Sequence, residues 1–276
     1  MVEILIHIDS RGATDMATRL FEPQLYLQSE GKSLVSQALL LGGLLISSVL
    51  ALMVFSRLRE TQYLWLGLLL IGVAGLEASR ENFLGTYVWP IHLPLPPQTL
   101  AIFACLVIFG MSKVVSHALE LPRRIPDAER FLFVLRWLAV IGCLVTFWNY
   151  GDGVRVMSGT SVVQNIATLL LSLQALRHDQ LATRIFPAAF SLALLTEIAR
   201  QLANLGMIPW IAAMDFSTYF FLLATPLILI GLVQQTRQLS EKLQVAEQIQ
   251  RAKTDFFVRI SHELRSPLNT ILGLSR

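Results

Sequence analysis

Seven stretches of apolar residues constrain this chain more than any other feature of its sequence. A helix that crosses a bilayer needs about 20 mostly apolar residues. With 54% hydrophobic and 15% charged residues, the chain is too apolar for an ordinary soluble domain. We therefore expect an all-α membrane protein with seven transmembrane helices between residues 33 and 233. The predicted spans are 34–55, 63–78, 100–119, 131–150, 154–176, 185–205 and 208–233.

Basic residues are concentrated in every second loop between the predicted spans, and this bias predicts the orientation of the chain in the membrane. Cytoplasmic loops of membrane proteins carry an excess of Lys and Arg. One set of loops holds Arg57, Arg59, Lys113, Arg123, Arg124, Arg130, Arg177, Arg184, Arg237 and Lys242, and the opposite set holds mainly Arg80, Arg155 and Arg200. We expect the N-terminus to lie outside and the C-terminus in the cytoplasm. We attribute the net charge of +3 to these basic loops. The sequence contains no basic patch of the kind that binds nucleic acid, so no nucleic-acid partner is expected.

Residues 1–32 differ from the spans that follow. Val2, Ile4, Ile6 and Ile8 alternate with polar or differently facing residues, which predicts a half-buried strand, and a turn follows at 10–12. No pattern of a signal peptide is present. We expect an extracytoplasmic segment with a short β remnant, which resembles the tail of a β-sandwich sensor domain, and the alternative is a disordered polar tail.

Six ionisable residues map to the outer ends of predicted spans, where charge is costly and tends to be functional. They are Glu77, Arg80, Glu81, Glu197, Arg200 and Asp215. Two interpretations fit their shared depth: an outward-facing cluster that forms a ligand pocket, or local ion pairs that hold helices together. Arg136, near the inner end of the fourth span, is expected to extend its side chain to the cytoplasmic surface. No metal site is predicted.

The connection between the second and third spans, residues 79–98, is long and rich in proline. Proline fixes an extended backbone, and Tyr87 and Trp89 suit the headgroup zone of a membrane. Anchoring at the interface is the favoured interpretation, and a lid over a ligand is the alternative.

Residues 234–254 are polar and have a helical pattern. Leu239, Leu243 and Ala246 follow a coiled-coil seam, but the same register then places polar residues at core positions. Shifting the register to Ile249, Ala252 and Phe256 restores an apolar seam, as a stutter does in a coiled coil. We hypothesise two packings of similar energy in this linker.

The final segment, residues 255–276, contains a motif with a histidine. Ser261-His262-Glu263-Leu264-Arg265-Ser266-Pro267-Leu268, preceded by Asp255-Phe256-Phe257, resembles the H-box of membrane sensor histidine kinases. This box begins the dimerisation and phosphoacceptor domain. A lone His-Glu pair would more often be an ordinary charged helix face, so the flanking residues and the membrane spans upstream carry this resemblance.

The resemblance implies a role for each residue of the box. His262 would be the phosphoacceptor, since a neutral imidazole is a good nucleophile near neutral pH. Glu263 would be the orienting base. Pro267 would bend the helix one turn further on. Ser266 stands where many relatives carry Thr or Asn that positions a water for dephosphorylation.

The chain as a whole resembles seven-transmembrane receptors with diverse intracellular signalling modules, here of the bacterial histidine kinase type. This implies a homodimer in the inner membrane that passes phosphate to an aspartate of a response regulator or receiver domain. ATP and Mg would bind a later catalytic domain, and because the chain ends at Arg276 we expect no cofactor in it and no autophosphorylation by it alone.

Other classes of membrane protein fit the sequence less well. One rival is a non-catalytic seven-helix receptor or partner subunit. A retinal protein would need a lysine inside a span, and Lys32, Lys113, Lys242 and Lys253 all lie outside span interiors. A transporter would favour paired broken helices, and no internal repeat is evident.

Overall fold

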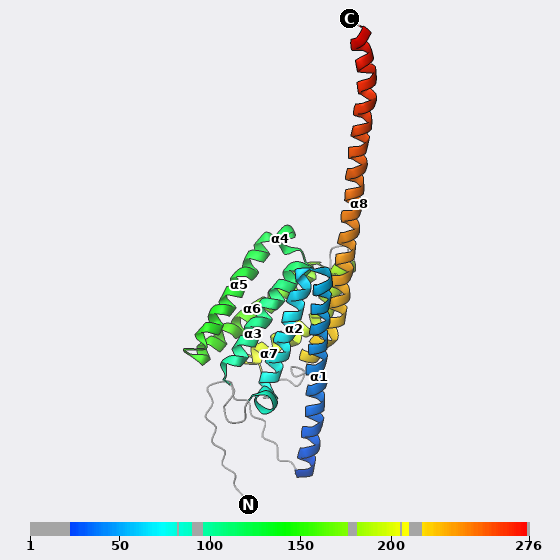
Figure 1. The fold of residues 1–276 in the computed structure, drawn as a ribbon. Helices are drawn as coiled ribbons and strands as arrows, with labels where there is room; N and C mark the ends of the chain where they lie inside the picture. The colour runs from blue at the N-terminus through cyan, green and yellow to red at the C-terminus, as the bar shows by residue number, and fades with distance from the viewer. Residues whose placement is uncertain are drawn as a thin grey trace, which may run out of the picture. The chain divides into compact units, whose positions relative to one another are not determined.

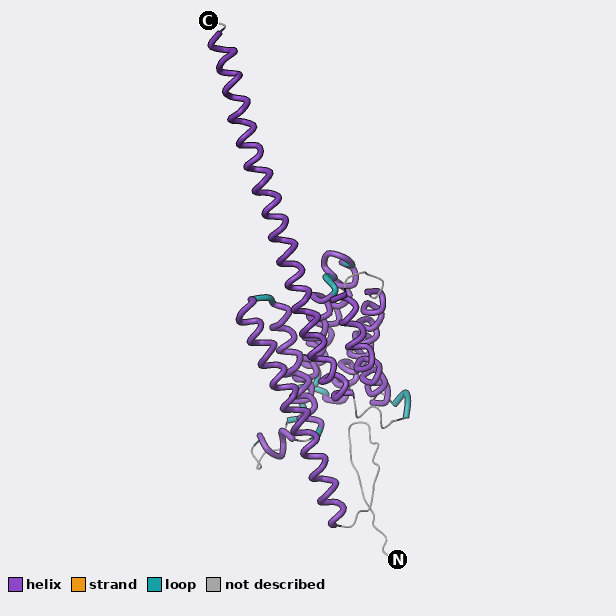
Figure 2. Tube along the Cα trace, turned by 90° about the vertical axis from the view of Figure 1, so that its right-hand side faces the viewer, coloured by secondary structure: helices purple, strands orange, loops and turns teal. Residues whose placement is uncertain are grey.

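The structure, a computed structural model, describes residues 23–81, 83–89, 96–175, 181–204, 206–209 and 217–274. Figures 1 and 2 show a chain built from helices, and no strand occurs among the described residues. The prediction of an all-α fold is confirmed for this part of the chain. The predicted N-terminal strand lies outside it. The elements are α1 (Pro23–Leu58), α2 (Thr61–Arg80), the π-helix η1 (Leu84–Val88), α3 (Gln98–Ala118), α4 (Leu121–Arg124), α5 (Pro126–Val145), α6 (Tyr150–Ala175), α7 (Leu181–Asn204) and α8 (Ser217–Leu274).

Five of these helices contain a segment long and apolar enough to cross a membrane. The segments are Leu34–Leu58, Thr61–Arg80, Gln98–Ala118, Tyr150–Gln174 and Ser217–Gln234. Helix α5 is less apolar because Asp127, Glu129, Arg130 and Arg136 lie within its 20 residues. The described chain is therefore a multi-pass membrane protein, whereas the predicted total of seven spans is supported for five helices.

The chain divides into two compact units, Met1–Gly231 and Leu232–Arg276. In the first unit, α2 lies between α1 and α3 (Figure 1), α3 also packs against α5 and α6, and α6 packs against α5 and α7. Small residues allow the close approach of α2 and α3, as is common between membrane helices. A Cβ atom on Gly110 of α3 would lie 3.0 Å from Cβ and 3.1 Å from Cα of Leu69 on α2.

The fourth predicted span ends earlier than expected. Helix α5 stops at Val145, and Tyr150, predicted to end that span, instead begins α6. The side chain of Asn149 explains the new start, because its Oδ1 accepts from the Asp152 N–H at 3.4 Å and its Nδ2 donates to the Asp152 carboxylate at 2.7 Å. Asn is a preferred residue at the N-cap of a helix. A span boundary predicted from apolar composition alone does not take such a cap into account.

The prediction that Arg136 extends to the surface is wrong. This residue is only 3% exposed, and its guanidinium donates to the Glu129 carboxylate and, through Nε, to the Leu132 carbonyl at 3.3 Å. It also lies over the rings of Phe109 and Phe133. An acidic partner two turns away on α5 satisfies the charge inside the protein, so the side chain does not need to reach solvent.

The α2–α3 contact generates a test of the packing. Replacing Gly110 with Leu places a side chain against the backbone of Leu69, and we expect a loss of roughly 1–3 kcal/mol in the free energy of unfolding. Gly42→Leu is the matched control, because nothing lies within 4 Å of a Cβ atom at Gly42. Thermal unfolding of both variants in detergent measures the difference. Equal melting temperatures would show that α2 and α3 do not pack as described.

Candidate functional site

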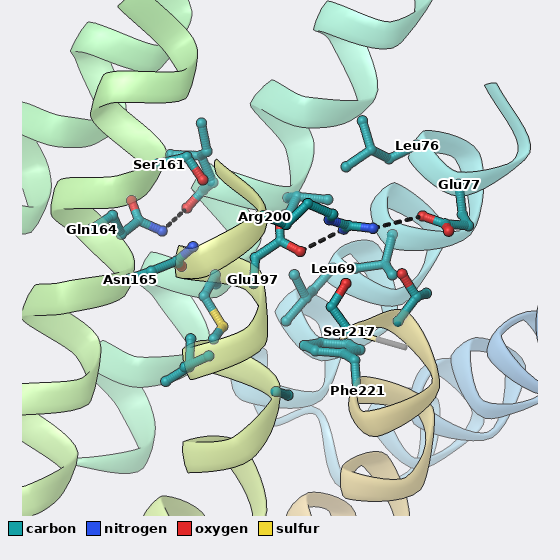
Figure 3. A pocket seen from close by; sticks show the side chains of 17 residues that line it. Leu69, Leu76, Glu77, Ser161, Gln164, Asn165, Glu197, Arg200, Ser217 and Phe221 are labelled. Carbon is teal, nitrogen blue, oxygen red and sulfur yellow. Dashed lines mark hydrogen bonds and ion pairs between the residues drawn. The ribbon is translucent and has the colours of Figure 1, made fainter. Parts of the chain in front are cut away.

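Four of the charged residues predicted to lie together do so, at the ends of two helices. We call Glu77 and Arg80 of α2 with Glu197 and Arg200 of α7 the charged cluster. Arg200 Nη2 lies 2.5 Å from Glu197 Oε2, and Arg200 Nη1 lies 3.6 Å from Glu77 Oε2. Arg80 Nη1 lies 3.5 Å from the same oxygen of Glu77. Figure 3 shows Arg200 between the two carboxylates. The local ion pairs Glu77–Arg80 and Glu197–Arg200 are therefore both present, as the second interpretation predicted. A third pair, Glu77–Arg200, joins α2 to α7.

Local sequence signals place the cluster at these helix ends. Arg80 is the last residue of α2, where the helix dipole favours a cation. Helix α7 ends at Asn204, and Gly206 follows with φ of 73°, a backbone conformation that glycine adopts without steric cost. The N–H groups of Gly206 and Met207 donate to the carbonyls of Ala203 and Leu202 at 2.9 and 3.0 Å, which is the Schellman pattern of a helix end.

The charged cluster lines an open cavity between α2, α3, α6 and α7. Its volume is about 490 Å³, and Leu76, Ala104 and Ile108 are among its apolar lining residues. An adjoining deeper cavity of about 60 Å³ shares Glu77, Glu197 and Arg200 and reaches α6 and the first turn of α8. Ligand pockets in proteins commonly measure roughly 300–1,000 Å³, with apolar walls and a few polar groups. The arrangement can therefore hold a small molecule.

A row of buried polar residues on α6, which the sequence analysis missed, includes Gln164 of the deeper cavity. Thr160, Gln164, Thr168 and Ser172 are each at most 7% exposed, and Gln164 Nε2 donates to the Ile108 carbonyl of α3 at 2.7 Å. Their four-residue spacing places them on one helix face. That spacing was readable in the sequence of the fifth predicted span.

The other predicted site residues have different positions. Glu81 lines the wide cavity and accepts a hydrogen bond from Gln37 of α1 at 2.9 Å. Asp215 lies outside the described residues. His262, Glu263, Ser266 and Pro267 all lie in α8, which continues past Pro267 to Leu274. Their roles remain predictions, as does a bend at Pro267. Among the described residues, no group of His, Cys, Asp and Glu could hold a metal ion.

The proline-rich connection is described only in part, because residues 90–95 fall outside the structure's description. Before them, η1 carries Tyr87 and is followed by Trp89, and the two side chains are 59% and 36% exposed. Exposed aromatic rings suit a membrane interface. The ring of Tyr87 also contacts that of Phe83, with a centroid distance of 4.7 Å.

The fold and composition define a helical multi-pass membrane protein. Residues 33–235 match the family described as 7TM diverse intracellular signalling. This match covers well over half of the chain, so the chain belongs to this family of membrane receptors that act in intracellular signalling. The search of the curated proteins and that of the solved structures each gave no match.

The geometry of the charged cluster predicts an asymmetric response to mutation. Arg200→Gln leaves two carboxylates, 13% and 22% exposed, short of a partner, and we expect a loss of roughly 3 kcal/mol in stability. The double variant with Glu197→Gln should recover part of that loss, because one of those carboxylates is then neutral. Thermal unfolding in detergent measures both.

Arg155→Gln is the matched control for this experiment. Arg155 pairs with Asp152 at 3.5 Å, but its side chain is 80% exposed, so its removal should cost less than about 1 kcal/mol. If Arg200→Gln were as mild as Arg155→Gln, the buried network would not hold α2 and α7 together.

Proposed function

We propose that this chain is the membrane sensor and the start of the phosphoacceptor domain of a two-component histidine kinase. It would relay an extracytoplasmic or membrane signal to His262, and the phosphate would pass to an aspartate of a response regulator. The observation that supports this most is α8, one helix of 58 residues. It contains both the last apolar segment, Ser217–Gln234, and the complete H-box.

The chemistry at His262 needs a nucleophile and a partner that orients it. A neutral ring nitrogen would attack the γ-phosphorus of ATP, the bond from phosphorus to the bridging oxygen would break, and ADP would leave. Glu263 would accept a hydrogen bond from the other ring nitrogen and support the positive charge that develops on the ring. ATP and Mg²⁺ would come from a catalytic domain, with Mg²⁺ neutralising the phosphate charge.

A homodimer would present two such helices side by side. In the second unit, Ile249 and Phe256 are 64% and 59% exposed, and Ala252 between them is exposed as well. Apolar residues at steps of three and four form a seam that a second helix can cover. This supports pairing of α8 in the register that begins at Ile249.

The bias of basic residues in the loops supports a location in the inner membrane with the end of α8 in the cytoplasm. The charged cluster and its cavity would then face the outside, since they lie at the end of α2 and the end of α7. A signal would enter at one end of the bundle and leave through α8 at the other.

Phosphotransfer to His262 tests the proposal directly. The chain in lipid nanodiscs would be mixed with labelled ATP and a kinase-active histidine kinase that lacks its own phosphoacceptor histidine. We expect acid-labile label on the chain, none on His262→Gln, and a rate lowered roughly 100-fold in Glu263→Gln. His178→Gln is the control, because the sequence predicts that this histidine falls between two spans, on the same side of the membrane as His262. Label that survives His262→Gln, or no label at all, would favour a non-catalytic receptor or partner subunit.

The linker generates a second test. One alanine inserted after Gln248 rotates the downstream face of a helix by about 100°, and we expect altered output from the complete kinase in cells. An insertion of seven residues at the same place is the control, because two turns restore the face to within about 20°. Equal output from the two insertions would exclude transmission by the helix face.

A further inference from the structure

Three buried polar atoms that line the deeper cavity have no hydrogen-bond partner among the described residues. They are Arg200 Nε, Gln164 Oε1 and Ser217 Oγ. The three residues are 7%, 1% and 2% exposed, and a buried polar group left unpaired costs roughly 1–3 kcal/mol. Two of the atoms can donate and two can accept, because a hydroxyl does both. The cavity therefore offers unused donors and unused acceptors in the same small space.

The charges around the cavity balance. The charged cluster that lines the wide part contains Arg80 and Arg200 together with Glu77 and Glu197, which gives two charges of each sign. A monoanion or a monocation would add one uncompensated charge to a partly dry site, and burying such a charge is costly. A ligand that carries both charges adds none.

The remaining wall of the cavity is apolar. Leu76, Ala104, Val107 and Ile108 lie on the neighbouring faces of α2 and α3 and line the wide part. Apolar side chains of this kind bury hydrocarbon at roughly 25 cal/mol for each Å² removed from water. A polar group alone would leave this wall without a contact.

We infer that this cavity binds a small zwitterion with an apolar part, such as a free α-amino acid with an apolar side chain. The ligand carboxylate accepts from the Nε–H of Arg200 and from Ser217, and its ammonium group donates to Gln164 Oε1 and to the carboxylates of the charged cluster. Its side chain packs against the apolar wall. The inference deepens the proposed receptor function, because it gives the chemical class of the signal.

Binding to the full chain in lipid nanodiscs tests this class. A panel of free L-valine, L-leucine, L-methionine and L-phenylalanine would be screened by thermal shift, and labelled L-leucine would be used for saturation binding. We expect saturable binding of at least one member. The matched analogues 4-methylpentanoate, which lacks the amine of leucine, and 3-methylbutylamine, which lacks the carboxylate, should bind at least tenfold more weakly.

Two variants connect the binding to the cavity. Arg200→Lys keeps the positive charge but removes the Nε–H group, and we expect binding to weaken roughly 10- to 100-fold. Ala104→Leu fills the wide cavity without changing a charge, so a similar loss is expected even if Arg200→Lys folds poorly. Gly42→Leu adds the same side chain where nothing lies within 4 Å and should bind like the unmodified chain.

The possible outcomes separate this inference from the kinase proposal. No binding by any panel member, or binding unaffected by Ala104→Leu, overturns the site. Binding of 4-methylpentanoate or 3-methylbutylamine as tight as that of leucine overturns the zwitterion class. Binding should be unchanged in His262→Gln, so a failure of phosphotransfer alone would leave the ligand site standing.

Discussion

The ion pairs of Arg200 are the interaction on which the architecture of the site depends. This one guanidinium contacts Glu197 on its own helix and Glu77 on α2, and it therefore joins two helices that are distant in sequence. A buried arginine needs such partners, because an uncompensated charge inside a protein is costly. The ion pairs also explain why a cavity lies next to Arg200. Side chains held in ion pairs cannot move to fill the neighbouring space, whereas an apolar side chain could.

The helix interfaces of the first unit divide into two kinds. Between α2 and α3 the contact is close and apolar, with Gly110 against the backbone of Leu69. Between α3 and α6 it includes a polar group, the amide of Gln164 that donates to the Ile108 carbonyl. Lipid tails are as apolar as leucine, so close packing and hydrogen bonds replace the hydrophobic effect in holding membrane helices together. The cavity lies where the packing is polar and incomplete.

Composition and periodicity predicted the helical fold and four members of the charged cluster, because apolar length and charge position are local properties of sequence. They could not predict that Arg200 bridges to α2, since a contact between helices depends on their rotation and tilt. The turn at 146–149 was missed because the cap at Asn149 depends on hydrogen-bond geometry rather than on hydropathy. The position of Arg136 was predicted wrongly because its side chain pairs with Glu129, seven residues earlier, and does not reach the surface.

The first turn of α8 connects the cavity to a helix that continues to Leu274. Ser217 and Thr218 line the deeper cavity, and the Tyr219 hydroxyl lies 2.5 Å from Ser36 Oγ of α1. A ligand shifts a conformational equilibrium only by as much as its contacts differ between the two states. Contacts to Ser217 differ between states if α8 moves relative to α2 and α7, whose charged residues are fixed by one another. Ser217 and His262 belong to one helix, so a shift of the first turn of α8 along the helix axis would also shift the segment that carries His262.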